Sequence, residues 1–209
     1  MSAPTASDTA SPLPGATLLS SGLTIDETHE AVLEANGLTL PLLAKKPQLG
    51  ERLEIFMVNY RQMVCLDRFP QLRHLEIIQQ ELHAIEGLDA CPLLETLFLP
   101  DNAIRHIGAG LRACARLREL NLNGNRLTAL GDGVRHLRAL EALFVCENRI
   151  ESLAGVEQCG ALRRLWAASN RITTVGSYVS VSVSGRADCF FLLDFSGSSV
   201  SVFFSTSIV

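Results

Sequence analysis

The chain has 209 residues and a formal net charge of −4 at pH 7, a length that allows one or two domains. Residues 50–176 contain as many arginines as aspartates and glutamates together and no lysine, so this segment is neutral. The acidic excess lies in the amino-terminal flank. A nucleic-acid surface carries a basic stripe, so a neutral segment argues against one and we expect no nucleic-acid partner.

The first segment, residues 1–22, is rich in Ser, Thr, Ala and Pro and has almost no large apolar side chains. This composition is typical of a disordered tail, because such a segment cannot bury enough apolar surface to fold. The segment also lacks the basic and apolar regions of a secretory leader. We therefore expect an intracellular, cytoplasmic chain.

Residues 23–49 are predicted to form an amino-terminal helix and capping segment. Thr24 or Asp26 is placed to cap a helix through the run ETHEAVLEAN, and Gly37 follows as a helix stop. The apolar side chains expected to dock this helix on the next segment are Ile25, Val32 and Leu33. A docked helix of this kind shields the open end of a repeat array.

One string recurs through residues 50–176: L-x-x-L-x-[apolar]-x-x-[N/Q]-x-[L/I]. Its five copies are spaced by 22 or 23 residues and begin at Leu72, Leu94, Leu117, Leu140 and Leu162. Tandem copies of this string are the signature of a leucine-rich repeat. The sequence therefore predicts an α/β fold, a right-handed leucine-rich-repeat solenoid with short parallel strands on its concave face. About five regular repeats follow one degenerate amino-terminal coil, in which Val58 stands where Asn is expected.

Two apolar columns, two residues apart, fall on one face of a short strand in each repeat. The strands are predicted near residues 74–78, 96–100, 119–123, 142–146 and 164–168. Further apolar columns follow each strand, and a single repeat cannot bury them alone. We expect neighbouring coils to bury these side chains, with short helices or irregular turns on the convex side.

A polar column marks the turn after each strand, and its members are Gln80, Asn102, Asn125, Asn148 and Asn170. A side-chain amide offers both a donor and an acceptor, and buried backbone N–H and C=O groups at a turn need both. The column is therefore predicted to form a structural ladder from coil to coil. Catalytic amides are the alternative, but a residue type that repeats in every coil favours the structural role.

The 22-residue period and the motif LxxLxLxxNxIxxIxGL resemble the leucine-rich repeats of the phosphatase-regulatory class. That class includes a nuclear regulator of protein phosphatase 1, an axonemal dynein light chain and a spliceosomal protein. The run from Leu53 to Leu97, with ANGL at residues 35–38, is similar to the opening of the leucine-rich repeat-containing protein 9 family, which is associated with cilia and flagella. Many more repeats follow in that family, so the resemblance implies a fragment or a truncated relative.

Three of the six cysteines, Cys91, Cys114 and Cys159, occupy one column with Phe69 and Leu137. A column that accepts Phe and Leu is apolar, so we predict buried thiols; redox-sensitive and metal-binding thiols are the alternatives. No C-x-x-C pair occurs and the five histidines share no ligand spacing, so we expect no metal and no cofactor. The common hydrolase, P-loop and zinc-protease motifs are absent from the sequence, which argues against an enzyme.

Alternate residues of each predicted strand point away from the core, onto the concave face. The residues predicted to bind a partner on this face are Glu76, Phe98, Asn121, Phe144, Trp166 and Arg164. Aromatic side chains in an exposed row favour a protein partner, because Trp, Tyr and Arg dominate binding hot spots. The alternative is that these aromatic side chains pack on one another along the sheet.

Residues 177–209 contain no repeat and alternate Ser with Val and Phe, a pattern that favours strands. Three interpretations stay open for this tail: a strand-like or poorly ordered end of the solenoid, a membrane span, and a segment with no evolved role. Asp194, Gly197 and many serines interrupt the apolar run that a membrane span needs, so we expect no membrane partner.

The sequence thus predicts a non-catalytic protein–protein interaction scaffold that binds a partner on its concave face. The narrower resemblance implies a role in a cilium or flagellum. The alternative function is that of a regulatory subunit of an enzyme such as protein phosphatase 1. Neither the identity of the partner nor the oligomeric state follows from the sequence.

Overall fold

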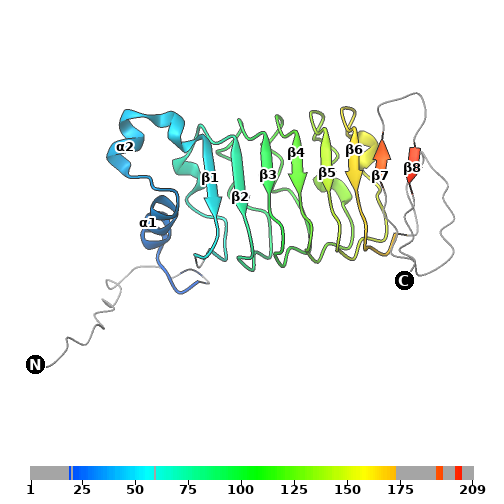
Figure 1. Ribbon diagram of the computed structural model, residues 1–209, viewed down its shortest axis with the longest axis horizontal. Helices are drawn as coiled ribbons and strands as arrows, with labels where there is room; N and C mark the ends of the chain where they lie inside the picture. Colours follow the sequence, from blue (N-terminus) through cyan, green and yellow to red (C-terminus); the bar gives the residue numbers. More distant parts are fainter. Residues whose placement is uncertain (1–18, 20, 59, 173–191, 195–200, 204–209) are drawn as a thin grey trace, which may run out of the picture.

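The computed structural model describes residue 19 and residues 21–58, 60–172, 192–194 and 201–203. These residues form one sheet of eight strands that lie side by side in chain order (Figure 1). The strands are β1 (Arg52–Ile55), β2 (His74–Ile77), β3 (Thr96–Phe98), β4 (Glu119–Asn121), β5 (Ala142–Phe144), β6 (Arg164–Trp166), β7 (Leu192–Asp194) and β8 (Ser201–Phe203). The short 3-10 helices are η1 (Pro47–Glu51), η2 (Leu66–Arg68), η3 (Gly131–Gly133) and η4 (Val156–Gln158). Most residues of the two predicted tails lie outside the described residues.

Strands β1 to β6 pair in parallel, and each residue pairs with the equivalent residue one repeat later, as Leu97 does with Leu120. This one-repeat register confirms the predicted solenoid. The register includes the degenerate first coil, because Leu53 and Ile55 are fully buried and supply both apolar positions of β1. Val58 in place of Asn therefore does not prevent the first coil from forming its strand.

The five strands predicted from the repeat begin at the predicted residues but end one or two residues earlier, for example at Phe98 rather than Pro100. The cause is a tight turn in which one residue of each coil has a left-handed backbone, as Asp101 does with a φ of 55°. An extended strand cannot continue through that conformation. The equivalent left-handed residues of the other coils are Met57, Gln79, Gly124, Glu147 and Ser169.

The core runs the length of the solenoid as stacked layers of apolar side chains. The third coil shows the pattern, because Leu97, Leu99, Ile104, Ile107 and Leu111 are each at most 2% exposed. Equivalent residues of the adjacent coils are buried beside them. Each side chain is thus covered by the coil before and the coil after, and full burial of one Leu or Ile stabilises the fold by about 1.5–3 kcal/mol.

The amino-terminal segment contains two helices, α1 (Ile25–Ala35) and α2 (Leu40–Lys45), which lie next to β1 in Figure 1. Thr24 caps α1, since its hydroxyl accepts a hydrogen bond from the Glu27 N–H (3.2 Å) and its own N–H donates to the Glu27 carboxylate (2.8 Å). Val32 and Leu33 are buried against the first coil. Ile25, the third residue expected to dock, is 46% exposed, and its carbonyl accepts a hydrogen bond from Cys65 Sγ of the first coil (3.3 Å).

A single side chain closes the open edge of β1. Asn36, which follows α1, donates from Nδ2 to the Glu54 carbonyl (3.0 Å) and accepts at Oδ1 from the Glu54 N–H (2.8 Å). The amide therefore occupies the place that the backbone of a preceding strand would take. Unpaired N–H and C=O groups at a sheet edge recruit other strands, and Asn36 satisfies both groups at the centre of β1.

At the other end of the sheet, β7 pairs with β6 in the antiparallel sense, with Leu192 opposite Trp166, and β8 pairs with β7. The described residues of the tail thus form strands, the conformation that their Ser, Val and Phe pattern favours. The other residues of 177–209 lie outside the described residues. Within the part of the chain that the structure describes, no helix is long and apolar enough to cross a membrane.

The polar column joins each coil to the coil before it. Asn125 donates from Nδ2 to the Leu99 carbonyl of the preceding coil (2.8 Å) and to the Leu122 carbonyl of its own coil (3.1 Å). Its Oδ1 accepts from the Ile104 N–H of the preceding coil (3.0 Å). One buried amide thus bonds to the backbone of two successive turns, which is the structural ladder expected of this residue type.

The other members of the column differ in whether their side-chain amide donates a hydrogen bond to the preceding coil. Asn102, Asn148 and Asn170 each donate to a carbonyl and accept from an N–H of the preceding coil. Among the described residues, Gln80 accepts from the Tyr60 N–H at 3.3 Å and donates only to carbonyls of its own coil. The longer Gln side chain folds back on its own turn, so the bond to the degenerate first coil is the weakest of the ladder.

A buried histidine lies where α1 meets the first coil. His29 is 3% exposed, and its Nδ1 lies 2.6 Å from Nη1 of Arg68, which can only donate, so the ring is neutral. Its Nε2 has no hydrogen-bond partner within the described residues. Burial and then the charge of Arg68 lower the pKa of His29, and the carboxylates of Asp26, Asp67 and Glu30 only partly oppose them.

The ladder makes a prediction about stability. We expect Asn125→Ala to lower the free energy of unfolding by about 1–3 kcal/mol, because buried backbone groups of two coils lose their partner. Asn102→Ala and Asn148→Ala should have similar effects in urea denaturation followed by circular dichroism. Asn121→Ala is the matched control, since the Asn121 side chain is half-buried and accepts from an N–H of its own coil. Equal stability of all four variants would contradict the structural role.

The buried histidine makes a prediction about pH. The folded state favours neutral His29, so its stabilising effect is complete above the usual pKa of 6.5 and is lost as the pH falls below that value, where the unfolded chain takes up the proton. We expect the melting temperature of the wild type to fall more than that of His29→Leu between about pH 8 and pH 5. His83→Leu, at an exposed position, should behave as the wild type does. Parallel pH profiles of wild type and His29→Leu would refute the assignment.

Candidate functional site

The outward side chains of β1 to β6 form one open surface, which we call the sheet face. Alternate residues of each strand contribute to it, and the one-repeat register aligns them in columns across the sheet. All six residues predicted to bind a partner lie on this face. Glu76, Phe98, Asn121 and Phe144 are half-buried, whereas Arg164 and Trp166 are exposed.

Phe144 and Trp166 form an exposed aromatic pair. The register places them opposite each other on β5 and β6, with ring centroids 5.9 Å apart and an angle of 56° between the ring planes. This distance lies within the range of favourable aromatic pairs. Trp166 still leaves 46% of its surface exposed, so contact with Phe144 does not account for the whole side chain.

Arg164 links this pair to an acid two strands away. Its guanidinium carbon lies 5.9 Å from the centroid of the Phe144 ring, and Nη2 lies 2.9 Å from Oε1 of Glu119. The residue between Arg164 and Glu119 in this column is Ala142, whose short side chain lets the arginine reach across β5. The side chains of the ion pair are 54% and 37% exposed, so the pair adds at most about 1 kcal/mol of stability and serves mainly to orient the guanidinium. Phe144, Arg164 and Trp166 are called the aromatic–arginine group below.

Phe98 lies apart from the aromatic–arginine group. The strand of Asn121 separates it from Phe144 in the sheet order. Two strand spacings amount to about 10 Å, which exceeds the reach of a direct aromatic pair. The aromatic side chains of the sheet face therefore form two separate hydrophobic anchors, Phe98 and the pair of Phe144 and Trp166.

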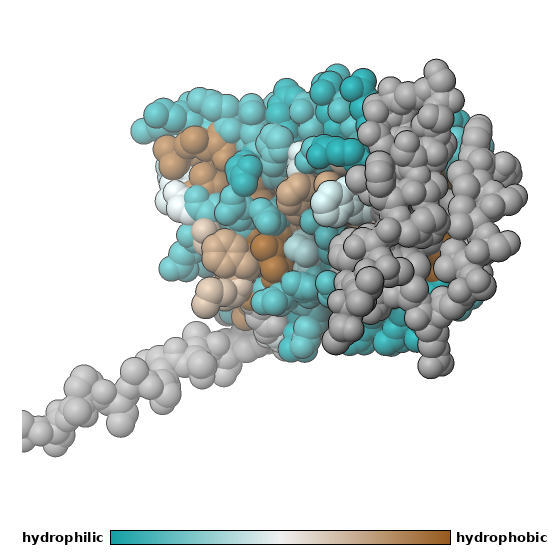
Figure 2. All heavy atoms as spheres, turned by 45° about the vertical axis from the view of Figure 1, so that its right-hand side comes forward, coloured by the Kyte–Doolittle hydropathy of each residue, from teal (hydrophilic) through white to brown (hydrophobic). Residues whose placement is uncertain are grey.

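The first coil contributes exposed apolar side chains that the sequence analysis missed. Phe56 and Met57, directly after β1, are 45% and 92% exposed. Figure 2 shows hydrophobic side chains interrupting the hydrophilic surface toward this end of the solenoid. The repeat spacing could have predicted the exposure of Phe56, because Phe56 stands 22 residues before Ile78, which is at an outward position of the next coil. It was passed over because the first coil departs from the repeat motif.

Glu76 lies in a charged part of the sheet face. It stands directly opposite Glu54 in the register, and Arg52 forms an ion pair of 2.8 Å with Glu54. Glu76, His74 and Phe98 help to line a hollow of about 30 Å³. A hollow of this size holds about one water molecule, so this part of the face fits a protein surface better than a small-molecule ligand.

The cysteine column is part of the core. Cys91, Cys114 and Cys159 are free thiols that are at most 5% exposed, beside Phe69 and Leu137 of the same column. Burial raises the pKa of Cys91 to about 11, that of Cys114 to about 12 and that of Cys159 to about 11. Within the described residues, no three His, Cys, Asp or Glu side chains lie close enough to hold a metal ion.

These thiols make a prediction about reactivity. Cys91, Cys114 and Cys159 should react slowly with a thiol reagent in the native protein and quickly after denaturation, because burial blocks access and keeps the thiol protonated. Cys146 on the sheet face is half-buried and should react before them. Mass spectrometry of partially labelled protein measures this order. Labelling of all four at one rate in the native protein would contradict the packing of the column.

No model of a known protein family matches the chain. Among solved structures, the chain is similar to the LRIM1/APL1C complex, with a TM-score of 0.51 and 24% sequence identity over 53% of this chain and 22% of that chain. It is also similar to an internalin (inlF) from Listeria monocytogenes, with a TM-score of 0.49 and 18% identity over 55% of this chain and 37% of that chain. The chain therefore spans well under two thirds of either structure.

At these identities the likeness concerns the fold alone. It agrees with the parallel strands in one-repeat register and with the amides that join successive coils. On these grounds the chain folds as a leucine-rich-repeat solenoid.

Proposed function

We propose that the chain is a non-catalytic scaffold that binds a protein partner across its sheet face. The observation that carries this proposal is the exposed aromatic–arginine group on β5 and β6. Trp166 leaves 46% of its surface exposed although it stands on a regular strand beside Phe144. Exposed apolar side chains that are rimmed by polar ones are typical of interaction sites.

The aromatic–arginine group has the properties of a binding hot spot. Trp and Arg are the residues that most often dominate protein interfaces, and they act best when they are held in place before binding. The Phe144 ring and the Glu119 carboxylate hold Arg164, and the sheet backbone holds Trp166. A partner therefore meets a surface that needs little ordering, which lowers the entropic cost of binding.

A protein partner fits the surface better than a nucleic acid does. The sheet face combines acids such as Glu76 and Glu119 with Arg164, so it has no basic stripe. Repeat solenoids offer extended surfaces to partners, and one of the similar solved structures is that of a complex. We propose no cofactor, since binding through this face requires none.

The finer assignment is a scaffold in a cilium or flagellum, which rests on the resemblance to the leucine-rich repeat-containing protein 9 family. The alternative is a regulatory subunit of an enzyme such as protein phosphatase 1, which rests on the 22-residue repeat class. We place either role in a reducing, intracellular compartment, because the five described cysteines are free thiols. Affinity purification with mass spectrometry separates the two, since one recovers axonemal proteins and the other a phosphatase catalytic subunit.

Substitution of the central aromatic residue tests the binding face. Once a partner has been identified, calorimetry measures its affinity for the wild type and the variant. We expect Trp166→Ala to weaken binding at least about tenfold, or 1.4 kcal/mol, because the substitution removes a central anchor. The melting temperature should barely change, since much of the side chain faces solvent. Leu40→Ala is the matched control: Leu40 is 60% exposed and lies on α2, away from the sheet face. Loss of stability in Trp166→Ala with unchanged affinity would refute the proposal.

A charge exchange tests whether the partner also contacts Arg164. The double variant Glu119→Arg, Arg164→Glu keeps both charges on the face and can re-form the ion pair in the opposite sense. We expect it to fold as the wild type does but to bind the partner more weakly, because electrostatic complementarity at the group is reversed. Unchanged affinity would restrict the binding contacts to the aromatic side chains.

A further inference from the structure

Two neighbouring coils are one residue longer than the rest. Leu94, Leu117 and Leu140 are 23 residues apart, whereas the flanking repeat leucines are 22 residues away. The extra residue falls in the loop between the core column of Ile107 and that of Leu111. The shorter coils have Glu86-Gly87 and Ala154-Gly155 in this loop, and the longer coils have Gly108-Ala109-Gly110 and Gly131-Asp132-Gly133.

Glycines keep the two longer loops wide. Gly108 and Gly131 turn the chain with φ values of 59° and 55°, a conformation that suits glycine. Gly110 and Gly133 touch the coil before them: a Cβ on Gly110 would lie 1.9 Å from the Ile85 carbonyl oxygen, and one on Gly133 would lie 2.5 Å from a side-chain atom of the preceding coil. The backbone of Gly110 and Gly133 therefore packs directly against the preceding coil. Gly108 and Gly131, at the start of each loop, have no side chain that could fill the space beside them.

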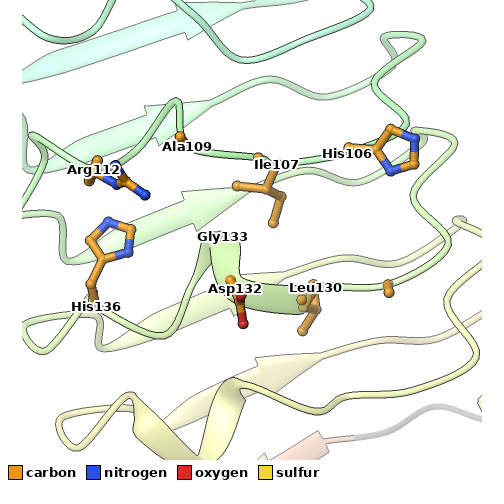
Figure 3. Close-up of a pocket in the computed structure, with 11 residues that line it drawn as sticks. His106, Ile107, Ala109, Arg112, Leu130, Asp132, Gly133 and His136 are labelled. Atoms are coloured by element: carbon orange, nitrogen blue, oxygen red, sulfur yellow. The ribbon is translucent and has the colours of Figure 1, made fainter.

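A hollow of about 290 Å³ lies where the two longer loops stack (Figure 3). Ile107 and Leu130 line part of it. In Figure 3, Arg112 and His136 lie close together at one end of the hollow, from successive coils, and His106 lies at the other end. None of the lining residues belongs to the sheet face, so the hollow is separate from the proposed partner site.

The charges of this hollow favour an anion. Arg112 has no carboxylate partner among the described residues, whereas the one acid of the lining, Asp132, pairs with Arg135 at 2.7 Å. Nε2 of His136 lies 2.9 Å from the Leu111 carbonyl oxygen. A carbonyl can only accept, so Nε2 carries the proton and this bond holds the ring next to Arg112. The positive charge of Arg112 is therefore left without a compensating carboxylate at this hollow among the described residues.

We propose that this hollow binds a phosphate monoester, with Arg112 as the main contact and His136 beside it. The planar guanidinium offers paired donors that match phosphate oxygens. The volume accommodates a phosphate and a small organic group, and the exposed Ala109 and Ala129 side chains provide apolar surface for that group. The source is either a free small phosphate compound or a phosphorylated side chain of a protein.

The test is calorimetric titration of the full chain with phenyl phosphate and with a phosphoserine peptide. We expect saturable one-to-one binding that Arg112→Gln weakens at least about tenfold, or 1.4 kcal/mol. Arg116→Gln is the matched control, because Arg116 is exposed on the same coil, does not line the hollow and has no carboxylate partner among the described residues. His136→Phe keeps a ring of similar shape and should weaken binding less than Arg112→Gln does. Circular dichroism checks that each variant is folded.

The two ligands identify the source. Tighter binding of the peptide than of phenyl phosphate, abolished by Arg112→Gln, assigns the site to a phosphorylated protein; the reverse order, with the same dependence on Arg112, assigns it to a small phosphate compound. The proposal is overturned if neither ligand saturates. It is also overturned if Arg116→Gln weakens binding as much as Arg112→Gln, or if benzoate binds as tightly as phenyl phosphate.

Discussion

Every coil of this solenoid relies on its neighbours to satisfy its backbone. The parallel strands exchange hydrogen bonds in a one-repeat register, and at the turn after each of β2 to β6 an amide side chain such as that of Asn125 bonds to the coil before it. A coil on its own would leave these N–H and C=O groups unpaired and its leucines in water. The core columns, the sheet face and the stacked loops therefore all depend on the one-repeat register of the strands.

The first and last coils of such an array have a neighbour on one side only, so their other side needs a different cover. The chain covers its two ends in different ways. At the amino-terminal edge, Asn36 pairs with both backbone groups of Glu54, while α1 buries Val32, Leu33 and His29 against the first coil. At the other edge, β7 and β8 extend the sheet with antiparallel strands. Neither end uses the repeat motif, because a repeat at the end of the stack has a neighbour on one side only.

The aromatic–arginine group and the hollow next to Arg112 both arise where the sequence departs from the repeat motif. Ala142 replaces a larger residue in its column, and Arg164 crosses that gap to Glu119 and places its charge by Phe144. One additional residue in each of two adjacent coils widens the loops and leaves the hollow next to Arg112. A regular array presents the same surface in every coil, so departures from the motif are what make one part of the surface chemically different from the rest.

The sequence by itself determined the solenoid, the start of each regular strand, the buried columns and the coil-to-coil role of Asn125, because all of these repeat at a constant spacing and depend on contacts between equivalent residues. It also placed Phe144 and Trp166 on the outward face. Only the tertiary structure decided that Ile25 is exposed, that Asn36 closes the first strand, and that Arg164 reaches Glu119. These contacts join residues that are not equivalent in the repeat, so their distances depend on how the coils stack and not on the spacing along the chain.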